Sequence, residues 1–239
     1  MTDETSSGTA TNDDVPATTR EFAAWNETMV ERYDIERYYE RSHALVRWVE
    51  RRRLQALVDL AHASPDARVL EVGCGAGHVL ERFADHERVG VDLSSTMLAR
   101  TRRRLRGRAG LINATAAALP FADGAFDIVL CTEVLEHVPD PARVVTELVR
   151  VAGPAGRVIV SIPNEANIDR AKKVLRRLLP FRGVLRTLAS EGNEWHIHRL
   201  DLTALRRMVR GVARIEGLRA VPNALLPLRY VASLRANRS

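Results

Sequence analysis

Short runs of apolar, mostly β-branched residues alternate along this chain with stretches in which apolar residues recur at a helical period. The runs predict strands near 69–72, 88–92 and 157–163, a strand that ends at about Cys131, and two later strands at 213–221 and 226–234. Runs that are apolar throughout are typical of parallel strands buried on both faces. The periodic stretches predict helices at 43–61, at about 77–83, at 141–151 and directly after Asp201. This alternation predicts an α/β fold with a doubly wound, Rossmann-like sheet.

A glycine-rich turn follows the first predicted strand. Residues 69–77 read Val-Leu-Glu-Val-Gly-Cys-Gly-Ala-Gly, and Asp92 ends the second apolar run. Glycines allow the backbone to pass close to a ligand where a side chain would collide, and free N–H groups of the following helix would point at that ligand. A carboxylate at the tip of the next strand can accept hydrogen bonds from both ribose hydroxyls. The pattern therefore predicts a nucleotide-like ligand.

The glycine spacing bears on which ligand this is. The dinucleotide fingerprint Gly-x-Gly-x-x-Gly would place a glycine at position 78, but His78 is there. Glu71 lies two residues before the first glycine, and an acid at that place favours a cationic ligand over a pyrophosphate. The pattern present, Gly-x-Gly-x-Gly preceded by Glu71, resembles motif I of the class I S-adenosylmethionine-dependent methyltransferases. S-adenosylmethionine carries an ammonium and a sulfonium group and no phosphate.

Several further blocks follow in a fixed order. They are Leu-Pro-Phe-Ala-Asp-Gly-Ala-Phe-Asp-Ile-Val at 119–129, Glu-His-Val-Pro-Asp-Pro at 136–141 and Gly-Pro-Ala-Gly-Arg-Val-Ile-Val-Ser-Ile-Pro at 153–163. With the glycine turn, this series resembles the class I S-adenosylmethionine-dependent methyltransferases, in particular the branch of ubiquinone and menaquinone biosynthesis. The resemblance implies a seven-stranded, mostly parallel sheet with an antiparallel last strand, and S-adenosylmethionine as cofactor.

The resemblance also implies which residues bind the cofactor. Asp92 would hold the ribose and Glu133 would lie near the amino-acid end. Relatives usually have an aspartate for the adenine amino group, whereas this chain has Thr115 at that place, with Asn113 within reach after a small loop shift. The full set expected at the cofactor is Glu71, Gly73, Cys74, Gly75, Gly77, Asp92, Leu93, Thr115, Ala116, Thr132 and Glu133.

Three histidines are candidates for the chemistry on the acceptor. His196 and His198 lie before the helix that Asp201 begins, and in an extended chain they share one face, so that one or both can take the acceptor proton. Structural hydrogen bonding at the helix start is the open alternative. His137 follows the fourth strand beside Glu136; either can orient the acceptor, although the family pattern indicates that His137 braces its loop. No metal is expected, because the His196–His198 pair has no evident third ligand.

Composition suggests one catalytic domain over 20–239, after a disordered tail at 1–19. Within the domain, 20–64 is expected to form a helical cap and 164–200 an insertion on the acceptor side. The whole chain carries a charge of +6, and because four acids and no base lie in 1–19, the remaining residues carry +10. Such a charge attracts anionic partners. Two cysteines, Cys74 and Cys131, fit a reducing compartment, and the protein is expected to be cytoplasmic.

The segment 170–188 holds seven Lys or Arg residues and no acid. Ala171, Val174, Leu175, Leu178 and Leu179 form one apolar stripe of a helix that Pro180 would end. One interpretation is a lid whose stripe packs over the acceptor pocket. Another is a helix that lies on an anionic membrane.

These observations predict methyl transfer to oxygen, nitrogen or carbon of a small or lipid-like metabolite. An RNA methyltransferase and a non-catalytic, S-adenosylmethionine-binding or membrane-associated accessory protein are the alternatives. A nucleic-acid substrate is disfavoured, because the residues after the fourth strand read Cys131-Thr-Glu-Val134 where amino-base methyltransferases have an Asn/Asp-Pro-Pro-Tyr/Phe motif. The oligomeric state stays open.

Overall fold

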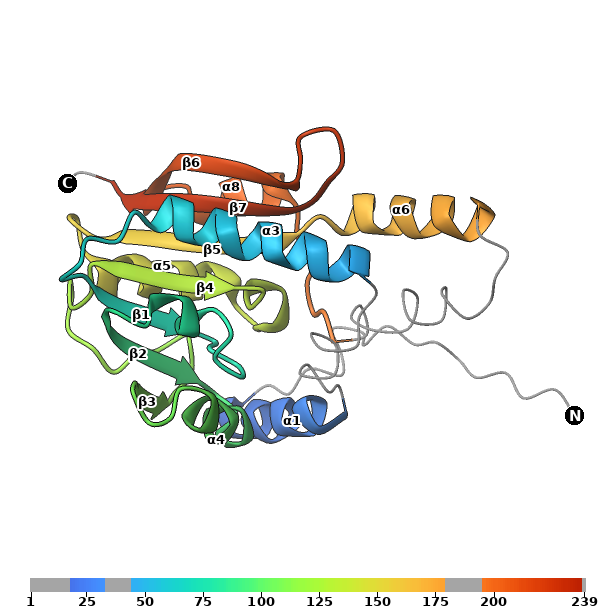
Figure 1. Cartoon of the computed structure of the whole chain (residues 1–239). Coiled ribbons are helices and arrows are strands. Elements are labelled where there is room, and N and C mark those ends of the chain that lie inside the picture. The colour runs from blue at the N-terminus through green and yellow to red at the C-terminus, as the bar shows by residue number, and fades with distance from the viewer. Residues whose placement is uncertain (1–17, 33–43, 179–194, 238–239) are drawn as a thin grey trace, which may run out of the picture.

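The computed structural model describes residues 18–32, 44–178 and 195–237. These residues contain a seven-stranded sheet with the strand order β3-β2-β1-β4-β5-β7-β6 (Figure 1). Adjacent strands pair in parallel, except that β7 runs antiparallel to both β5 and β6. The predicted sheet, with its antiparallel last strand, is confirmed. The strands are β1 (Arg68–Val72), β2 (Glu87–Asp92), β3 (Gly110–Asn113), β4 (Ile128–Thr132), β5 (Arg157–Pro163), β6 (Ala213–Pro222) and β7 (Pro227–Ala236).

Helices cover both faces of the sheet (Figure 1). One apolar core lies between the sheet and the helices α5 and α8, and a second lies between the sheet, α3 and the short helix η2. Alternate residues of β1 serve the two cores, Val69 on the α3 side and Leu70 on the α5 side. The helices are α1 (Thr19–Arg32), α3 (Ala44–Ala61), α4 (Ser95–Arg104), α5 (Pro141–Ala152), α6 (Glu165–Leu178) and α8 (Leu202–Val209), with 3₁₀ helices η2 (Leu80–Phe83) and η3 (Leu135–His137).

Side-chain caps explain where three helices begin. Ser94, Asp140 and Asp201 each accept a hydrogen bond from a backbone N–H of the first turn of α4, α5 and α8, respectively. Such caps satisfy donors that have no partner inside the helix. The predicted helices at 141–151 and after Asp201 are confirmed, and α3 confirms the helix predicted at 43–61 as far as the described residues reach.

The helix predicted at 77–83 is wrong. Gly77 has φ of +80°, outside the helical range, and only Leu80–Phe83 form a short 3₁₀ helix. The physical reason is that few residues separate the glycine turn from β2, which already begins at Glu87. Buried Leu80 and Phe83 pack into the α3-side core and hold the short helix there. The expected tail lies outside the described residues apart from 18 and 19.

Arg150 of α5 clamps the segment that leads into β4. Its guanidinium donates to the carbonyl oxygens of Leu119 and Phe121 at 3.0 and 2.7 Å, and it pairs with Asp123 at 2.9 Å. Glu147, one turn earlier, pairs with Arg150 at 2.8 Å and accepts the N–H of Leu119. One arginine thus holds the Leu-Pro-Phe-Ala-Asp segment onto the helix.

Replacing Arg150 should therefore destabilise the fold. Arg150→Met leaves two carbonyl oxygens and Glu147 without their donor, and we expect a loss of about 1–3 kcal/mol in the free energy of unfolding. Urea denaturation followed by circular dichroism measures this loss. Arg102→Met removes an exposed arginine of α4 and should change stability by less than about 0.5 kcal/mol. Equal effects of the two substitutions would refute the clamp.

Candidate functional site

The glycine turn joins β1 to η2 at the carboxyl end of the parallel strands. The N–H groups of Gly73 and Cys74 both donate to the carbonyl oxygen of Val91, at 2.8 and 3.0 Å. The N–H of Gly75 donates to Oδ2 of Asp92 at 2.8 Å. The end of β2 therefore fixes the turn and the carboxylate in one position relative to each other.

Helix α4 holds the turn from the other side. Thr101 donates its hydroxyl hydrogen to the carbonyl oxygen of Gly75 at 2.5 Å, and Arg104 donates from Nε to the carbonyl oxygen of Ala76 at 2.8 Å. With these carbonyl groups bound behind it, the turn presents Gly75 outward.

The three glycines have different roles. A Cβ atom at Gly73 would lie 2.3 Å from a methyl group of Val134, and one at Gly77 would lie 3.0 Å from Thr101. A Cβ at Gly75 would meet no atom of the described residues within 4 Å. The expectation that all three make room for a ligand is thus wrong for Gly73 and Gly77, which are small because protein packs against them. Only Gly75 borders open space.

Asp92 lies half-buried at the tip of β2, as predicted for a ribose-binding acid. Its Oδ1 accepts the N–H of Ser94 at 2.9 Å, and its Oδ2 accepts the N–H of Gly75. Each carboxylate oxygen keeps a further lone pair, so both can still accept a hydroxyl hydrogen of a ribose. Burial raises the pKa of Asp92, and nearby Glu27 adds to the rise.

Helix α1 covers this end of the site. Glu27 accepts hydrogen bonds from the hydroxyls of Ser94 and Ser95 and from the N–H of Thr96, which lowers its pKa against the opposing effect of burial. Val30 packs with Ala76 and Met97. The expected cap thus has α1 over the glycine turn, whereas α3 packs against the sheet.

The remaining cofactor candidates also lie at this end of the sheet. Glu71 is buried, its Oε2 has no hydrogen-bond partner among the described residues, and burial raises its pKa well above the usual range. Glu133, at φ +55°, accepts from the hydroxyl of Ser161 at 2.8 Å and pairs with Arg229 at 3.0 Å. The acids Glu27, Glu71, Asp92 and Glu133 give this end of the sheet a group of acceptor oxygens.

The other residues predicted at the cofactor site lie at this end of the sheet and contact neighbouring protein groups. Thr132 is buried at the end of β4. Thr115 and Ala116 lie half-buried after β3, and the hydroxyl of Thr115 accepts the N–H of Ala117 at 3.3 Å. The amide of Asn113 donates to the carbonyl oxygen of Leu93 at 2.8 Å. The Cys74 thiol is buried and points toward Gly90, and burial raises its pKa.

A second group of polar side chains forms where the segment after 194 returns to η3. The N–H groups of Ile197 and His198 donate to the carbonyl oxygen of Glu136 at 2.8 and 3.1 Å. These two bonds place Trp195 and His196 against His137, with ring centroids 4.7 and 4.9 Å away. Trp195 also packs against the Val30, Ala76 and Met97 cluster and thereby links this group to the glycine turn.

The hydrogen bonds of the two imidazoles set where their lone pairs point. Nδ1 of His137 lies 3.1 Å from the carbonyl oxygen of Trp195, and Nδ1 of His196 lies 2.7 Å from a carboxylate oxygen of Glu165. A carbonyl or carboxylate oxygen can only accept, so Nδ1 is the donor in both contacts, and in a neutral imidazole Nε2 then carries the lone pair. Burial, with His196 nearby, lowers the pKa of His137 to about 3.

Glu136 completes this group. It is 1% exposed, and neither carboxyl oxygen has a hydrogen-bond partner among the described residues. Burial raises its pKa well above the usual range, with Glu133 adding to the rise. One carboxyl oxygen of Glu136 and one nitrogen each of His137 and His196 lie within 4.8 Å of one another.

His198 does not belong to this group. Its Nε2 bonds to the carbonyl oxygen of Pro139 at 3.2 Å, so the prediction that His196 and His198 share one face is wrong: the segment folds around the Glu136 carbonyl group instead of running extended.

The residues that sequence reasoning missed are Glu27, Glu165, Trp195 and Arg229. Their spacing carries no motif, and only long-range contacts place them here.

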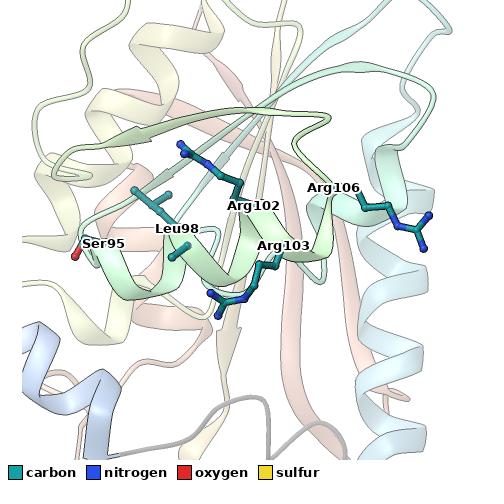
Figure 2. A pocket seen from close by; sticks show the side chains of 6 residues that line it. Ser95, Leu98, Arg102, Arg103 and Arg106 are labelled. Atoms are coloured by element: carbon teal, nitrogen blue, oxygen red, sulfur yellow. The ribbon is translucent and has the colours of Figure 1, made fainter.

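A separate pocket lies on the outer surface of α4, lined by Ser95, Leu98, Ala99, Arg102, Arg103 and Arg106 (Figure 2). The side chains of Arg102, Arg103 and Arg106 point in different directions in this view. They do not converge on one ligand position, and Arg102 and Arg103 lie in the last turn of α4, where positive charge stabilises a helix end.

Comparisons with known proteins decide the family. The model of the methyltransferase domain matches residues 70–160. The demethylmenaquinone methyltransferase of Thermus thermophilus is 36% identical over 166 residues, which cover 64% of this chain and 73% of that protein. This chain belongs to the S-adenosylmethionine-dependent methyltransferases.

Other relatives agree with this membership. The ubiquinone biosynthesis O-methyltransferase of Methylococcus capsulatus is 40% identical over 114 residues, which cover 44% of this chain and 48% of that protein. The chain thus spans about half the length of that curated relative. A solved structure from Thermotoga maritima, described as an S-adenosylmethionine-dependent methyltransferase and possible histamine N-methyltransferase, has a TM-score of 0.64 at 22% identity and covers 88% of this chain and 99% of that one. It shows the same fold.

The open space at Gly75 makes a sharp test of the cofactor site. Gly75→Val would place methyl groups in the space that the cofactor needs, and we expect binding of S-adenosylhomocysteine to be lost in isothermal titration. Gly107→Val is the matched control, because Gly107 also has positive φ and also meets nothing within 4 Å, but it lies beyond the far end of α4. Both substitutions strain the backbone by about 1–2 kcal/mol. Retained binding by Gly75→Val, or loss in both variants, would contradict the assignment.

Proposed function

We propose that this methyltransferase moves the methyl group of S-adenosylmethionine to a hydroxyl oxygen of a small, lipid-like acceptor. The acceptor hydroxyl would lie at Glu136, His137 and His196. The oxygen attacks the sulfonium methyl group in line, and the enzyme contributes chiefly alignment and exclusion of water.

The observation that carries this proposal is the group of buried lone pairs beside the glycine turn. A hydroxyl oxygen must lose its proton as it attacks, whereas a neutral amine already carries a free lone pair. One nitrogen of each imidazole and one carboxyl oxygen of Glu136 lie within 4.8 Å of one another, after β4 at the carboxyl end of the sheet, where parallel α/β sheets bind ligands. Such groups favour an acceptor whose proton must be removed.

The relatives support a phenolic, lipid-like acceptor class. The names of two relatives are ubiquinone biosynthesis O-methyltransferase and tocopherol O-methyltransferase.

The surface beyond the carboxyl end of the sheet supports the proposed contact with a membrane. Helix α6 extends away from the sheet instead of folding back over it (Figure 1). Its Val174 is 54% exposed, and Arg170 and Lys173 are exposed. The exposure of Val174 favours the membrane interpretation over the lid. Residues 179–188 of the basic segment lie outside the described residues.

Further apolar side chains are exposed close to α6. Asn167 of α6 donates to the carbonyl oxygen of Pro227 at 3.0 Å, next to the loop that carries Leu225, which is 96% exposed, and Leu226. No described helix is long and apolar enough to cross a membrane. We propose that α6 and this loop, with exposed Trp48 of α3, lie on an anionic membrane surface, because basic and apolar groups together bind such surfaces.

The proposed acceptor site predicts a large and selective loss of rate. His196→Gln removes a lone pair from the group, and we expect kcat for a phenol carrying a polyprenyl chain to fall about 100-fold or more, while the affinity for S-adenosylhomocysteine stays unchanged. His198→Gln, two residues further on, should keep most of the activity. Equal losses in both variants, or a normal rate in His196→Gln, would contradict the proposed role of this group.

The membrane contact is tested by sedimentation with vesicles of phosphatidylcholine and phosphatidylglycerol. Arg170→Glu combined with Lys173→Glu should abolish sedimentation with these vesicles, since each basic side chain near an anionic surface contributes about 1 kcal/mol. Arg102→Glu combined with Arg103→Glu changes the net charge equally on the surface of α4 and should leave sedimentation intact. If the parent protein stays in the supernatant, the chain does not bind this surface.

A further inference from the structure

The group formed by Glu136, His137 and His196 has the composition of a metal site. It offers one carboxylate oxygen and two imidazole nitrogens from residues far apart in sequence, all within 4.8 Å. Tetrahedral zinc sites that act in catalysis commonly use three such protein ligands and keep a fourth position open. Mg²⁺ and Ca²⁺ prefer oxygen ligands, so two imidazoles favour a first-row transition metal.

Each ligand atom is available. The carboxyl oxygens of Glu136 are buried and have no hydrogen-bond partner among the described residues, which is costly for a carboxyl group that stays unpaired. His137 and His196 both use Nδ1 as donor, so Nε2 of each is free to ligate.

The partners of the two histidines are those that metal-ligating histidines usually have. His196 donates to the buried carboxylate of Glu165, and His137 donates to the carbonyl oxygen of Trp195. A carboxylate or carbonyl oxygen on the far nitrogen fixes the tautomer and raises the basicity of a ligand. Glu165 is 3% exposed and is itself held by Arg199 at 3.0 Å.

We propose that Glu136, His137 and His196 bind a zinc-like divalent cation that holds the acceptor hydroxyl. No metal was expected from the sequence, because the pair His196 and His198 had no evident third ligand. In the structure, His198 bonds to Pro139 instead, and Glu136 and His137 of η3 lie beside His196. With ligand distances of about 2.0–2.2 Å for zinc, the three atoms need only draw together slightly.

The inference rests on the proposed function and specifies how the hydroxyl is activated. The cation takes the hydroxyl oxygen in its open position and lowers the pKa of the hydroxyl, so its proton leaves to water. The oxygen then forms the O–C bond, the S–C bond breaks, and its electron pair returns to sulfur, giving S-adenosylhomocysteine. The two imidazoles act as ligands and take up no proton.

Metal binding is measured separately from activity. Untagged protein, freed of metal with a chelator, is titrated with Zn²⁺ by calorimetry and with Co²⁺ by its visible absorption. We expect one cation per chain. Glu136→Gln, His137→Asn and His196→Asn should each weaken binding by more than 10-fold, and Glu165→Gln by about 10- to 100-fold. His198→Asn is the matched control and should bind as the parent does. Normal binding of S-adenosylhomocysteine shows that each variant is folded.

The outcomes separate the cation from the proposed function. Absence of Zn²⁺ and Co²⁺ binding by the parent, or binding that survives both Glu136→Gln and His196→Asn, overturns the metal site. Full methyl transfer to a phenol in excess chelator overturns its role while the proposed function stands. A bound cation without transfer to any hydroxylated acceptor overturns the proposed function and leaves the site intact.

Discussion

A chain of buried and half-buried charges at the carboxyl end of the sheet holds together the elements on which both proposed sites depend. Arg229 of β7 pairs with Glu50 of α3 and with Glu133 after β4, each at 3.0 Å. Glu50 also pairs with Arg53, which is 1% exposed. A buried charge without its partner is strongly unfavourable, so these side chains fix α3, β4 and β7 relative to one another.

This arrangement sets the start of η3. Glu133 has φ of +55°, and its N–H donates to the carbonyl oxygen of Ser161 while its carboxylate accepts from the hydroxyl of Ser161. The backbone turns sharply there and carries Val134 over Gly73 and Glu136 toward the segment after 194. A conformation that is unfavourable for a side-chain residue is thus held by contacts on both sides, and it places the acceptor group next to the glycine turn.

The two sites separate the two requirements of methyl transfer. Around Gly75 and Asp92, hydrogen bonds from β2 and α4 fix the glycine turn, which is the proposed place of the cofactor. Around Glu136, His137 and His196 lies the proposed acceptor site. Trp195 packs against the cluster that includes Ala76 of the turn and against the ring of His137, so one side chain links the two proposed sites.

The amino-acid sequence by itself determined the sheet and its order of elements, and it located the glycine turn and Asp92 at the carboxyl end of the parallel strands. The apolar runs, the capping residues Asp140 and Asp201, and the glycine turn with Asp92 are local signals, because strands, caps and turns depend on neighbours in the chain. Tertiary structure alone decided that Gly73 and Gly77 face protein, that the turn leads into a short 3₁₀ helix, and that His196 meets His137 and Glu136 while His198 does not. Those outcomes depend on contacts between different elements, from Gly77 to Thr101 of α4 up to the bonds from Ile197 and His198 to the carbonyl oxygen of Glu136, about 60 positions earlier. The local spacing of residues does not specify such contacts.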